Sequence, residues 1–569
     1  MANVDEVSPL LSKQEQSLRK SRSYAGSQGR DGAIRQSVSY SSINTSTDDI
    51  EEHDPGTSAM LHRYKYYNKL APHSESSLVM PDHVVPSLFF LIIPGKDSGK
   101  QGSIVTIFSI WNTMMGTSLL SMPWAISQAG FGTGIAIMVV MSGIMLFTAY
   151  RVVKSIDGIP RLGEVVEFSD ICKYHLGRVG EFSAVFFSLF ALLGAMVVYW
   201  VLMSNFLYNT VAFIYESVNH QNVSDRVTGN GSQYDVLCPN IPLYLIEDNA
   251  KPINNTTSLH TMQQTYSPIK YLRHNVIQQT TSNTTAPSLF DQVWNQTTTV
   301  PLFLILVLFP LMNFKSPTFF TKFNSLGTIS VLYLLTFTTI KGVRWGFHLD
   351  FNPAHVNTYV PEFETTLFTM TGILSLGLFI HNAIISIMRT HSNPKAVGRD
   401  LTIAYILVAL TYLYIGVFFF ATFPLHKYCI EDNFLNNFLK SDTLSVVARV
   451  GLFFQMVTVF PLLIYIFRLQ FMHSMFGAIY PSIRHVLVLN VVLTIICVLF
   501  AIFLPSIGTI IRFSGAFCGL AYAFTLPCLV YILHLKDMGK LTWFISIVTS
   551  IIILLGIANF IGQFLVIEK

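Results

Sequence analysis

The chain has 569 residues, of which 51% are hydrophobic and only 12% are charged, whereas about 25% of residues are charged in a typical soluble protein. The charges are concentrated in residues 1–100, which contain 11 Lys and Arg and 12 Asp and Glu. The rest of the chain carries too few charges to cover a water-soluble globule, which excludes a soluble enzyme. We therefore predict a polar N-terminal segment followed by a polytopic membrane domain.

The N-terminal segment contains 17 serines and little apolar sequence. Because it can bury too little apolar surface to offset the entropy of ordering, we predict a largely disordered cytosolic tail. Glu6, Leu10 and Leu11 fit the acidic dileucine pattern of endolysosomal sorting signals, although such short patterns also arise by chance. An aromatic cluster at 64–70 and a proline-bounded strip at 81–86 are typical of segments that fold on a partner; low-complexity sequence is the alternative.

From Ser103 onward, apolar runs of about 20 residues recur, which is the length that an α-helix needs to cross a bilayer. We predict an all-α polytopic membrane domain over residues 103–565 with 11 transmembrane helices. The runs are 103–128, 131–153, 182–214, 299–314, 320–342, 366–388, 399–422, 443–468, 485–504, 507–533 and 542–565.

The basic residues predict the orientation of these helices. Lys and Arg are most frequent in the loops that face the cytosol if the N-terminus is cytosolic and the C-terminus lumenal. The segment 215–298, between helices three and four, then lies in the lumen, the only side on which N-x-S/T sequons are glycosylated. Its six sequons are at Asn222, Asn230, Asn254, Asn255, Asn283 and Asn295.

The same topology places two cysteines, Cys238 and Cys429, in lumenal loops and the other four in the cytosol or in helices. A disulfide between these two would tie the glycosylated loop to the connection between helices seven and eight. Two free thiols are the alternative.

The first apolar run contains a polar and small-residue stretch that suits a substrate site better than a lipid-facing helix. A break near Met115–Gly116 would leave the amides of Gly116, Thr117 and Ser118 at the positive end of a half-helix, where an amino-acid carboxylate can bind. The carbonyls before the break can bind an ammonium group or Na⁺. A helix-packing seam is the alternative. The predicted substrate-binding residues are Asn112, Thr113, Met114, Met115, Gly116 and Thr117.

The sixth run, with Gly372 and Gly377, supplies a second glycine-interrupted helix. Interrupted helices at runs one and six are typical of a five-plus-five inverted repeat. His381, just beyond, is either a gating or proton-sensing group or a packing histidine. In run three, Tyr199, Ser204 and Asn205 either line the far wall of the cavity or pack helices together.

Thr458 in the eighth run is a candidate ligand for a coupling Na⁺, since its hydroxyl lies in mid-membrane; bonding back to its own helix is the alternative. No Asp or Glu lies deep in any predicted helix, which favours neutral amino acids as cargo. The predicted helices also contain no paired carboxylates, His-rich cluster or activated nucleophile, so we do not expect an enzyme.

Several long runs of sequence resemble the sodium-coupled neutral amino acid transporters, in particular their lysosomal, arginine-sensing branch. The resemblance covers residues 103–565 and the tail segments 64–70 and 81–86. The runs that carry it are IWNTMMGTS (110–118), RVVKS (151–155), GAMVVYWVLMSNFLYNT (194–210), NFKSP (313–317), FIHN (379–382), RDLTIAY (399–405), TYLYIGV (411–417), QMVTV (455–459) and IIRFSGAFCGLA (510–521).

The resemblance implies an eleven-helix transporter of the amino acid/polyamine/organocation, LeuT-like type, with helices one and six broken. It implies substrate contacts at 112–117 and a sodium-linked threonine at Thr458. Beside these, we predict Gly377 and His381 at the cavity wall, Met115 as a second Na⁺ ligand, and no cofactor other than Na⁺ as a coupling ion. It also implies the lumenal disulfide between Cys238 and Cys429.

The resemblance further implies a place in the lysosomal and late endosomal membranes. There the protein would bind lumenal arginine, export leucine and other neutral amino acids, and signal to mTOR complex 1 through the Ragulator complex and Rag GTPases. An arginine receptor with negligible flux is the alternative. Residues 463–468 fit a cholesterol-contact pattern. The tail residues that match the docking positions are Tyr67, Leu70, Pro81 and Pro86.

Overall fold

The computed structural model describes residues 102–156, 167–219, 236–239, 290, 293–313, 325–352, 359–389, 391–476 and 482–566. All of them belong to one compact unit, Ala59–Lys569. Several predicted functional residues lie outside the described residues and stay predictions. They are Glu6, Leu10, Leu11, Tyr67, Leu70, Pro81, Pro86, Asn222, Asn230, Asn254, Asn255 and Asn283.

The described part of the chain is helical, with two isolated β-bridges besides. Its first helices are α4 (Ser103–Met114), α5 (Ser118–Ala129), α6 (Phe131–Lys154), α7 (Phe168–Val218), α11 (Val300–Met312), α13 (Ser325–Trp345), α14 (Phe368–Gly377) and α15 (Ile384–Arg389). The later ones are the 3₁₀ turn η4 (Pro394–Ala396), α16 (Val397–Leu413), the π-helix η5 (Tyr414–Phe418), α17 (Phe419–Thr422), the 3₁₀ turns η6 (Lys427–Cys429) and η7 (Phe434–Asn437), α18 (Thr443–Phe476), α19 (Ile483–Phe503), α20 (Ile507–Cys518), the π-helix η8 (Gly519–Thr525), α21 (Leu526–Asp537) and α22 (Trp543–Leu565).

These helices agree with the apolar pattern of the sequence. Each of the eleven predicted runs overlaps at least one helix. Within the described residues, seven helices are long and apolar enough to cross a membrane, and the bent pair α4–α5 makes an eighth. Of the remaining helices, α11 and α14 are shorter and apolar, and α13 is not among those seven. The number of eleven crossings and the inverted repeat therefore stay predictions.

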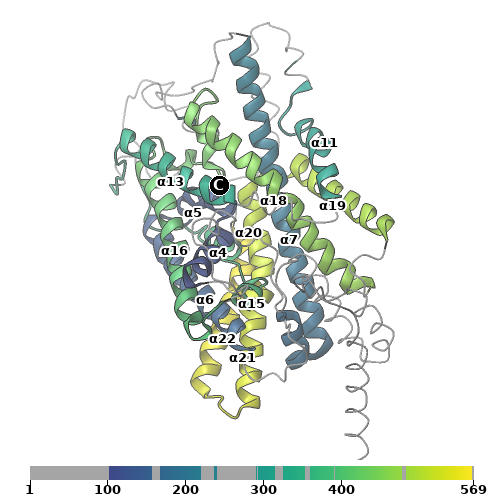
Figure 1. The fold of residues 1–569 in the computed structure, drawn as a ribbon. Helices are drawn as coiled ribbons and strands as arrows, with labels where there is room; N and C mark the ends of the chain where they lie inside the picture. Colours follow the sequence, from purple (N-terminus) through teal and green to yellow (C-terminus); the bar gives the residue numbers. More distant parts are fainter. Residues whose placement is uncertain are drawn as a thin grey trace, which may run out of the picture. The chain divides into compact units, whose positions relative to one another are not determined.

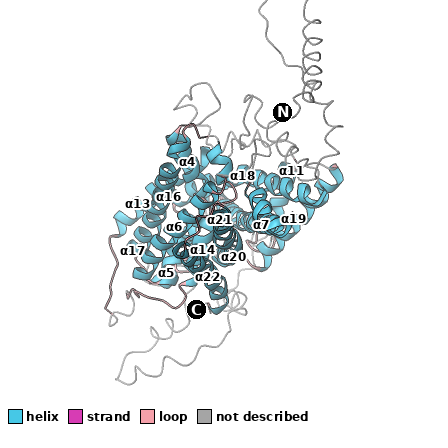
Figure 2. Ribbon diagram, turned by 90° about the horizontal axis from the view of Figure 1, so that it is seen from below, coloured by secondary structure: helices cyan, strands magenta, loops and turns pink. Residues whose placement is uncertain are grey.

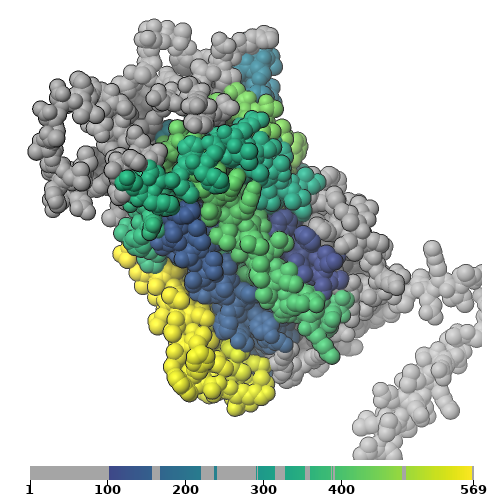
Figure 3. All heavy atoms as spheres, turned by 90° about the vertical axis from the view of Figure 1, so that its left-hand side faces the viewer, coloured from purple at the N-terminus to yellow at the C-terminus, as the bar shows by residue number. Residues whose placement is uncertain are grey.

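Helices distant in sequence pack side by side. Figure 1 shows α18 crossing beside α7, the most extensive of the helix contacts. In Figure 2, which looks along the helices, α14, α20 and α22 lie together, in agreement with their mutual contacts. The face in Figure 3 shows blue α6 between green α16 and the yellow C-terminal helices.

A glycine allows the tight turn between α5 and α6. Gly130 has φ +86°, and a Cβ there would lie 2.7 Å from the backbone of Glu362 and Phe363. A side chain at this position would be strained and would also clash. The turn therefore holds the second half of the broken first span against the segment that leads into α14.

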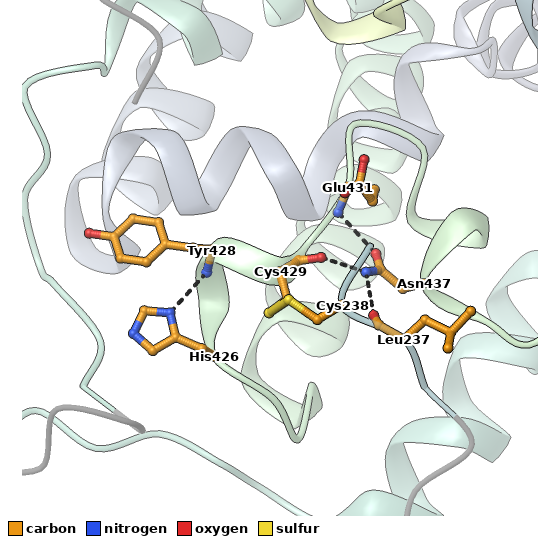
Figure 4. The surroundings of a disulfide bond; sticks show 7 residues. All are labelled: Leu237, Cys238, His426, Tyr428, Cys429, Glu431 and Asn437. Atoms are coloured by element: carbon orange, nitrogen blue, oxygen red, sulfur yellow. Dashed lines mark hydrogen bonds between the residues drawn. A yellow bond between two sulfur atoms is a disulfide. The ribbon is translucent and has the colours of Figure 1, made fainter. Parts of the chain in front are cut away.

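The predicted disulfide between Cys238 and Cys429 is present, which confirms the pairing (Figure 4). The two Cα atoms are 4.8 Å apart, within the usual range for a disulfide. Asn437 supports the bridge, because its Nδ2 donates to the carbonyl oxygens of Cys429 at 2.5 Å and Leu237 at 3.2 Å. The Leu237 amide also donates to the Asn437 carbonyl, 2.8 Å away. The segment around Cys238 is thus fixed to the connection between α17 and α18.

Candidate functional site

The first apolar span is broken at the predicted position. α4 ends at Met114, α5 begins at Ser118, and the two helices meet at an angle of 63°. Met115 has a non-helical ψ of 80°, and the Gly116 amide donates to the Met114 carbonyl, 2.9 Å away. No backbone hydrogen bond joins the Thr117 or Ser118 amide to another described residue. These two amides are thus available to a ligand at the start of α5. The prediction that the Gly116 amide is also free is wrong, because that amide is bonded to Met114 within the break.

A tyrosine of α16 connects this break to the end of α14. The Tyr412 hydroxyl lies 2.6 Å from the Met114 carbonyl oxygen and 3.0 Å from the Gly377 carbonyl oxygen. A Cβ on Gly377 would approach Ser118 Cβ to 3.1 Å and the Tyr412 ring to 3.2 Å. The predicted site residues Met114 and Gly377 are therefore brought together, and glycine permits the close approach.

Two further side chains of α16 hold the same region. The Tyr405 hydroxyl donates to the Leu378 carbonyl at 3.2 Å, just beyond the end of α14. The Trp111 indole of α4 donates to the Thr411 hydroxyl at 3.1 Å. Immediately after Tyr412, the chain forms the π-helix η5, a rare element that occurs often at functional sites. Helix α16 thus supports the ends of both interrupted helices.

A narrow cavity lies against the break. It is lined by residues of α4–α5, α7, α13 and α18, and it has room for about one water molecule rather than an amino acid. Of the predicted substrate-binding residues, three line it. The lining residues are Met115, Gly116, Thr117, Leu119, Leu120, Tyr199, Val331, Leu334, Leu452, Gln455 and Met456.

The other polar residues predicted for the first span make contacts within the protein. Asn112 Oδ1 accepts a hydrogen bond from the Thr328 hydroxyl of α13 at 3.0 Å. Thr113 is exposed, and its hydroxyl donates to the Ser109 carbonyl of its own helix at 2.7 Å. Neither side chain lines the cavity.

The residues predicted for the far wall on α7 also lie away from the cavity. The Ser204 hydroxyl donates to the Trp200 carbonyl of the same helix at 2.9 Å. Asn205 Oδ1 accepts from the side-chain amide of Asn209 at 3.3 Å and from that of Asn433 at 3.4 Å. Asn205 therefore faces the connection that carries Cys429, and Tyr199 is the α7 residue on the cavity wall.

His381 lies in the interruption between α14 and α15 and is fully buried. Its Nε2 is 2.8 Å from the Thr148 hydroxyl of α6, and its ring stacks on Phe379 with 5.7 Å between the centroids. It is thus packed against α6 and does not line the cavity.

Thr458 bonds back to its own helix, the alternative stated above. Its hydroxyl donates to the Gln455 carbonyl, 2.7 Å away. The oxygen still has lone pairs for a cation, but Thr458 does not line the cavity, whereas Met115 does. A Na⁺ site formed by Met115 and Thr458 stays a prediction.

At the start of α4, a polar network around the buried carboxylate of Asp400 joins three segments. Asp400 of α16 is fully buried and lies 2.7 Å from His391 Nε2 and 2.8 Å from Arg399 Nε. The Arg399 guanidinium also donates to the Ser103 hydroxyl at 3.2 Å. The first half of the broken span is thereby linked to α16 and to the segment that follows α15.

The comparisons with known proteins agree with this architecture. The family described as "Transmembrane amino acid transporter protein" matches residues 99–227 and 275–567. The chain belongs to this family. Within this transporter family, a relative from Xenopus tropicalis named neutral amino acid transporter 9 is 46% identical over 533 residues, 91% of this chain and 92% of the relative.

Two other relatives in the family cover similar lengths. The neutral amino acid transporter 9 of Rattus norvegicus is 45% identical over 534 residues, 91% of each chain. A Caenorhabditis elegans protein named sodium-coupled neutral amino acid transporter 9 homolog is 46% identical over 514 residues, 89% of this chain and 80% of the relative. The resemblance read from the sequence is therefore confirmed, and the protein is a multi-pass member of an amino acid transporter family.

Sequence reasoning missed two polar residues at the break and its cavity, Tyr412 and Gln455, and a buried carboxylate outside the cavity, Asp432. Tyr405 and Tyr412 lie seven residues apart, hence on one helix face, a signal that was present in the sequence. Asp432 lies outside the apolar runs, yet its carboxylate accepts from the Gly508 amide at 2.9 Å and the Ser506 hydroxyl at 3.1 Å. Burial raises the pKa of this carboxyl above its usual value, while these hydrogen bonds act in the opposite direction.

We expect the substitution Tyr412→Phe to weaken amino-acid binding by about tenfold, because it removes the hydroxyl that bridges the two interrupted helices. The dissociation constant of a radiolabelled amino acid, measured on the purified transporter, tests this. Tyr414→Phe is the matched control, since the Tyr414 hydroxyl is exposed and contacts Thr339 at 2.6 Å. Equal affinities of the Tyr412→Phe and wild-type proteins would contradict the bridging role.

Proposed function

We propose that the chain is a secondary amino acid transporter whose substrate binds at the break of the first span. The observation that carries the proposal is the 63° bend between α4 and α5 beside a cavity in a member of an amino acid transporter family. The substrate carboxylate binds the amides of Thr117 and Ser118, and the carbonyls before the break receive its ammonium group. Alternating access then requires the breaks at α4–α5 and α14–α15 to move against the remaining helices.

The finer parts of the proposal come from the family resemblance. The protein acts in lysosomal and late endosomal membranes, with a cytosolic N-terminus and a lumenal C-terminus. It binds lumenal arginine, exports leucine and other neutral amino acids, and uses Na⁺, held by Met115 and Thr458, as coupling ion. Cholesterol contacts it near residues 463–468. The name of the C. elegans relative supports sodium coupling.

Transport is tested by reconstituting the full chain in liposomes and measuring efflux of radiolabelled leucine and arginine with and without a Na⁺ gradient. We expect saturable leucine efflux that arginine inhibits. Arginine binding without efflux of either amino acid would instead support the second candidate, a receptor with negligible flux. That alternative remains because both functions use the same cavity.

For the tail, we propose docking to the Ragulator–Rag GTPase complex, which reports amino acid sufficiency to mTOR complex 1. Deleting residues 1–86 is expected to abolish recovery of Rag GTPases with the protein while leaving amino-acid efflux from liposomes unchanged. Equal recovery of Rag GTPases by the truncated and full-length chains would refute this assignment. The efflux measurement shows that the truncated membrane domain is folded.

A further inference from the structure

One wall of the cavity carries a buried acceptor that no described residue satisfies. Gln455 lies on α18 at the cavity, and its Oε1 is buried without a hydrogen-bond partner among the described residues. Buried polar atoms in proteins almost always have a partner. Because Gln455 lies on the cavity wall, an occupant of the cavity that carries an N–H or O–H group, either water or a ligand, is the nearest source of the missing donor.

A glycine on α13 leaves room for the Gln455 amide. A Cβ on Gly327 would lie 2.9 Å from Gln455 Nε2 and 3.3 Å from Asn112 Oδ1. Asn112 is itself held by Thr328, the next residue on α13. The amides of Gln455 and Asn112 thus form a polar corner beside α13, one turn of α4 before the break.

The rest of the cavity divides into two kinds of surface. Its backbone polar groups are those of the break at Met115–Thr117, and Tyr199 adds a hydroxyl. The remaining lining is apolar, made of Leu119, Leu120, Val331, Leu334, Leu452 and Met456. An amino acid whose carboxylate binds the amides of the break would extend its side chain toward this apolar lining and Gln455, which requires the cavity to widen beyond the space for one water molecule that it has here.

Building on the proposed transport function, we propose that Gln455 distinguishes amino acids whose side chain carries N–H donors from those with apolar side chains. A guanidinium or an amide group donates to Gln455 Oε1, whereas leucine leaves that oxygen unpaired. Sites with a buried group that must hydrogen-bond a ligand discriminate strongly against analogues that lack the matching group. Gln455 is thus a specificity-determining residue, while the break binds the part common to all amino acids.

The experiment measures the dissociation constants of radiolabelled arginine, glutamine and leucine on the purified full chain. In Gln455→Leu, we expect the affinities for arginine and glutamine, relative to leucine, to fall about 10- to 100-fold. Gln455→Glu is expected to favour arginine over leucine more than the wild type does, because a carboxylate pairs with the guanidinium. Gly327→Ala is expected to lower the affinities for arginine and glutamine, relative to leucine, by less than Gln455→Leu does. The added methyl group displaces the Gln455 amide without removing it.

Gln470→Leu is the matched control. Gln470 lies on the same helix, away from the cavity, where its Oε1 accepts from the Ser188 hydroxyl at 3.1 Å. It should keep the wild-type order of affinities. If Gln455→Leu lowers all three affinities equally, or none, the specificity role is overturned while the transport function stands. A wild-type protein that binds none of the three amino acids overturns both.

Discussion

Replacing Thr117 with tryptophan is expected to abolish amino-acid binding while the protein stays folded. Thr117 lines the cavity and is only 8% exposed, and it supplies one of the two amides at the start of α5. The indole would occupy the space that a substrate needs beside this amide. The neighbouring Met115 and Met456 are flexible side chains that can move to accept the larger group.

Binding of radiolabelled arginine and leucine to the purified variant measures this effect. Val140→Trp is the matched control. This substitution introduces the same side chain at a lipid-facing position, because Val140 is 59% exposed on α6. Size-exclusion chromatography establishes that both variants are folded. Wild-type affinity in Thr117→Trp would show that the substrate binds elsewhere.

The substitution Lys341→Met is expected to lower the free energy of unfolding by about 3–5 kcal/mol, because it leaves a buried carboxylate without its partner. Lys341 Nζ on α13 lies 2.7 Å from Asp442 Oδ1, and the two side chains are 2% and 11% exposed. The Asp442 carboxylate also accepts from the Ser445 amide at the start of α18, 3.0 Å away. The ion pair therefore joins α13 to the first turn of α18.

Thermal denaturation in detergent measures the loss of stability as a lower midpoint. The double variant Lys341→Met/Asp442→Asn should recover most of it, since the remaining side chain is uncharged and keeps its shape. Lys536→Met, at an exposed position of α21, should leave the midpoint unchanged. A midpoint in Lys341→Met equal to that of the wild type would mean that Asp442 is solvated or paired with another group.

Much of the architecture can be predicted from the sequence, because apolar length and small-residue interruptions are local properties. The break at Met115–Gly116 follows from polar and small residues at membrane depth, where a continuous lipid-facing helix is unfavourable. The pairing of Cys238 with Cys429 follows from topology, since those two residues alone fall on the predicted lumenal side.

The directions of single side chains are harder to predict, because they depend on how each helix is rotated about its axis. Thr113, Ser204 and Thr458 all donate to carbonyls of their own helices, an option open to any Ser or Thr in an apolar helix. Sequence patterns cannot separate this arrangement from a cavity-facing hydroxyl. Tyr412, by contrast, bonds to Met114 and Gly377 on helices far away in the chain. Its spacing from Tyr405 indicates which helix face it lies on, but not these partners. Gln455 lines a cavity whose other walls come from distant helices, so its local sequence does not reveal its position either.

The bridge between Cys238 and Cys429 closes a loop of the chain with a sequence separation of 191 residues. A protease that cuts one peptide bond between these two cysteines therefore produces two fragments that remain covalently attached until they are reduced. One fragment carries α4 to α7 and the other carries α18 to α22. Such a nicked molecule would migrate as a single species on a non-reducing gel and keep its helices together, which is an advantage wherever hydrolases surround an exposed loop.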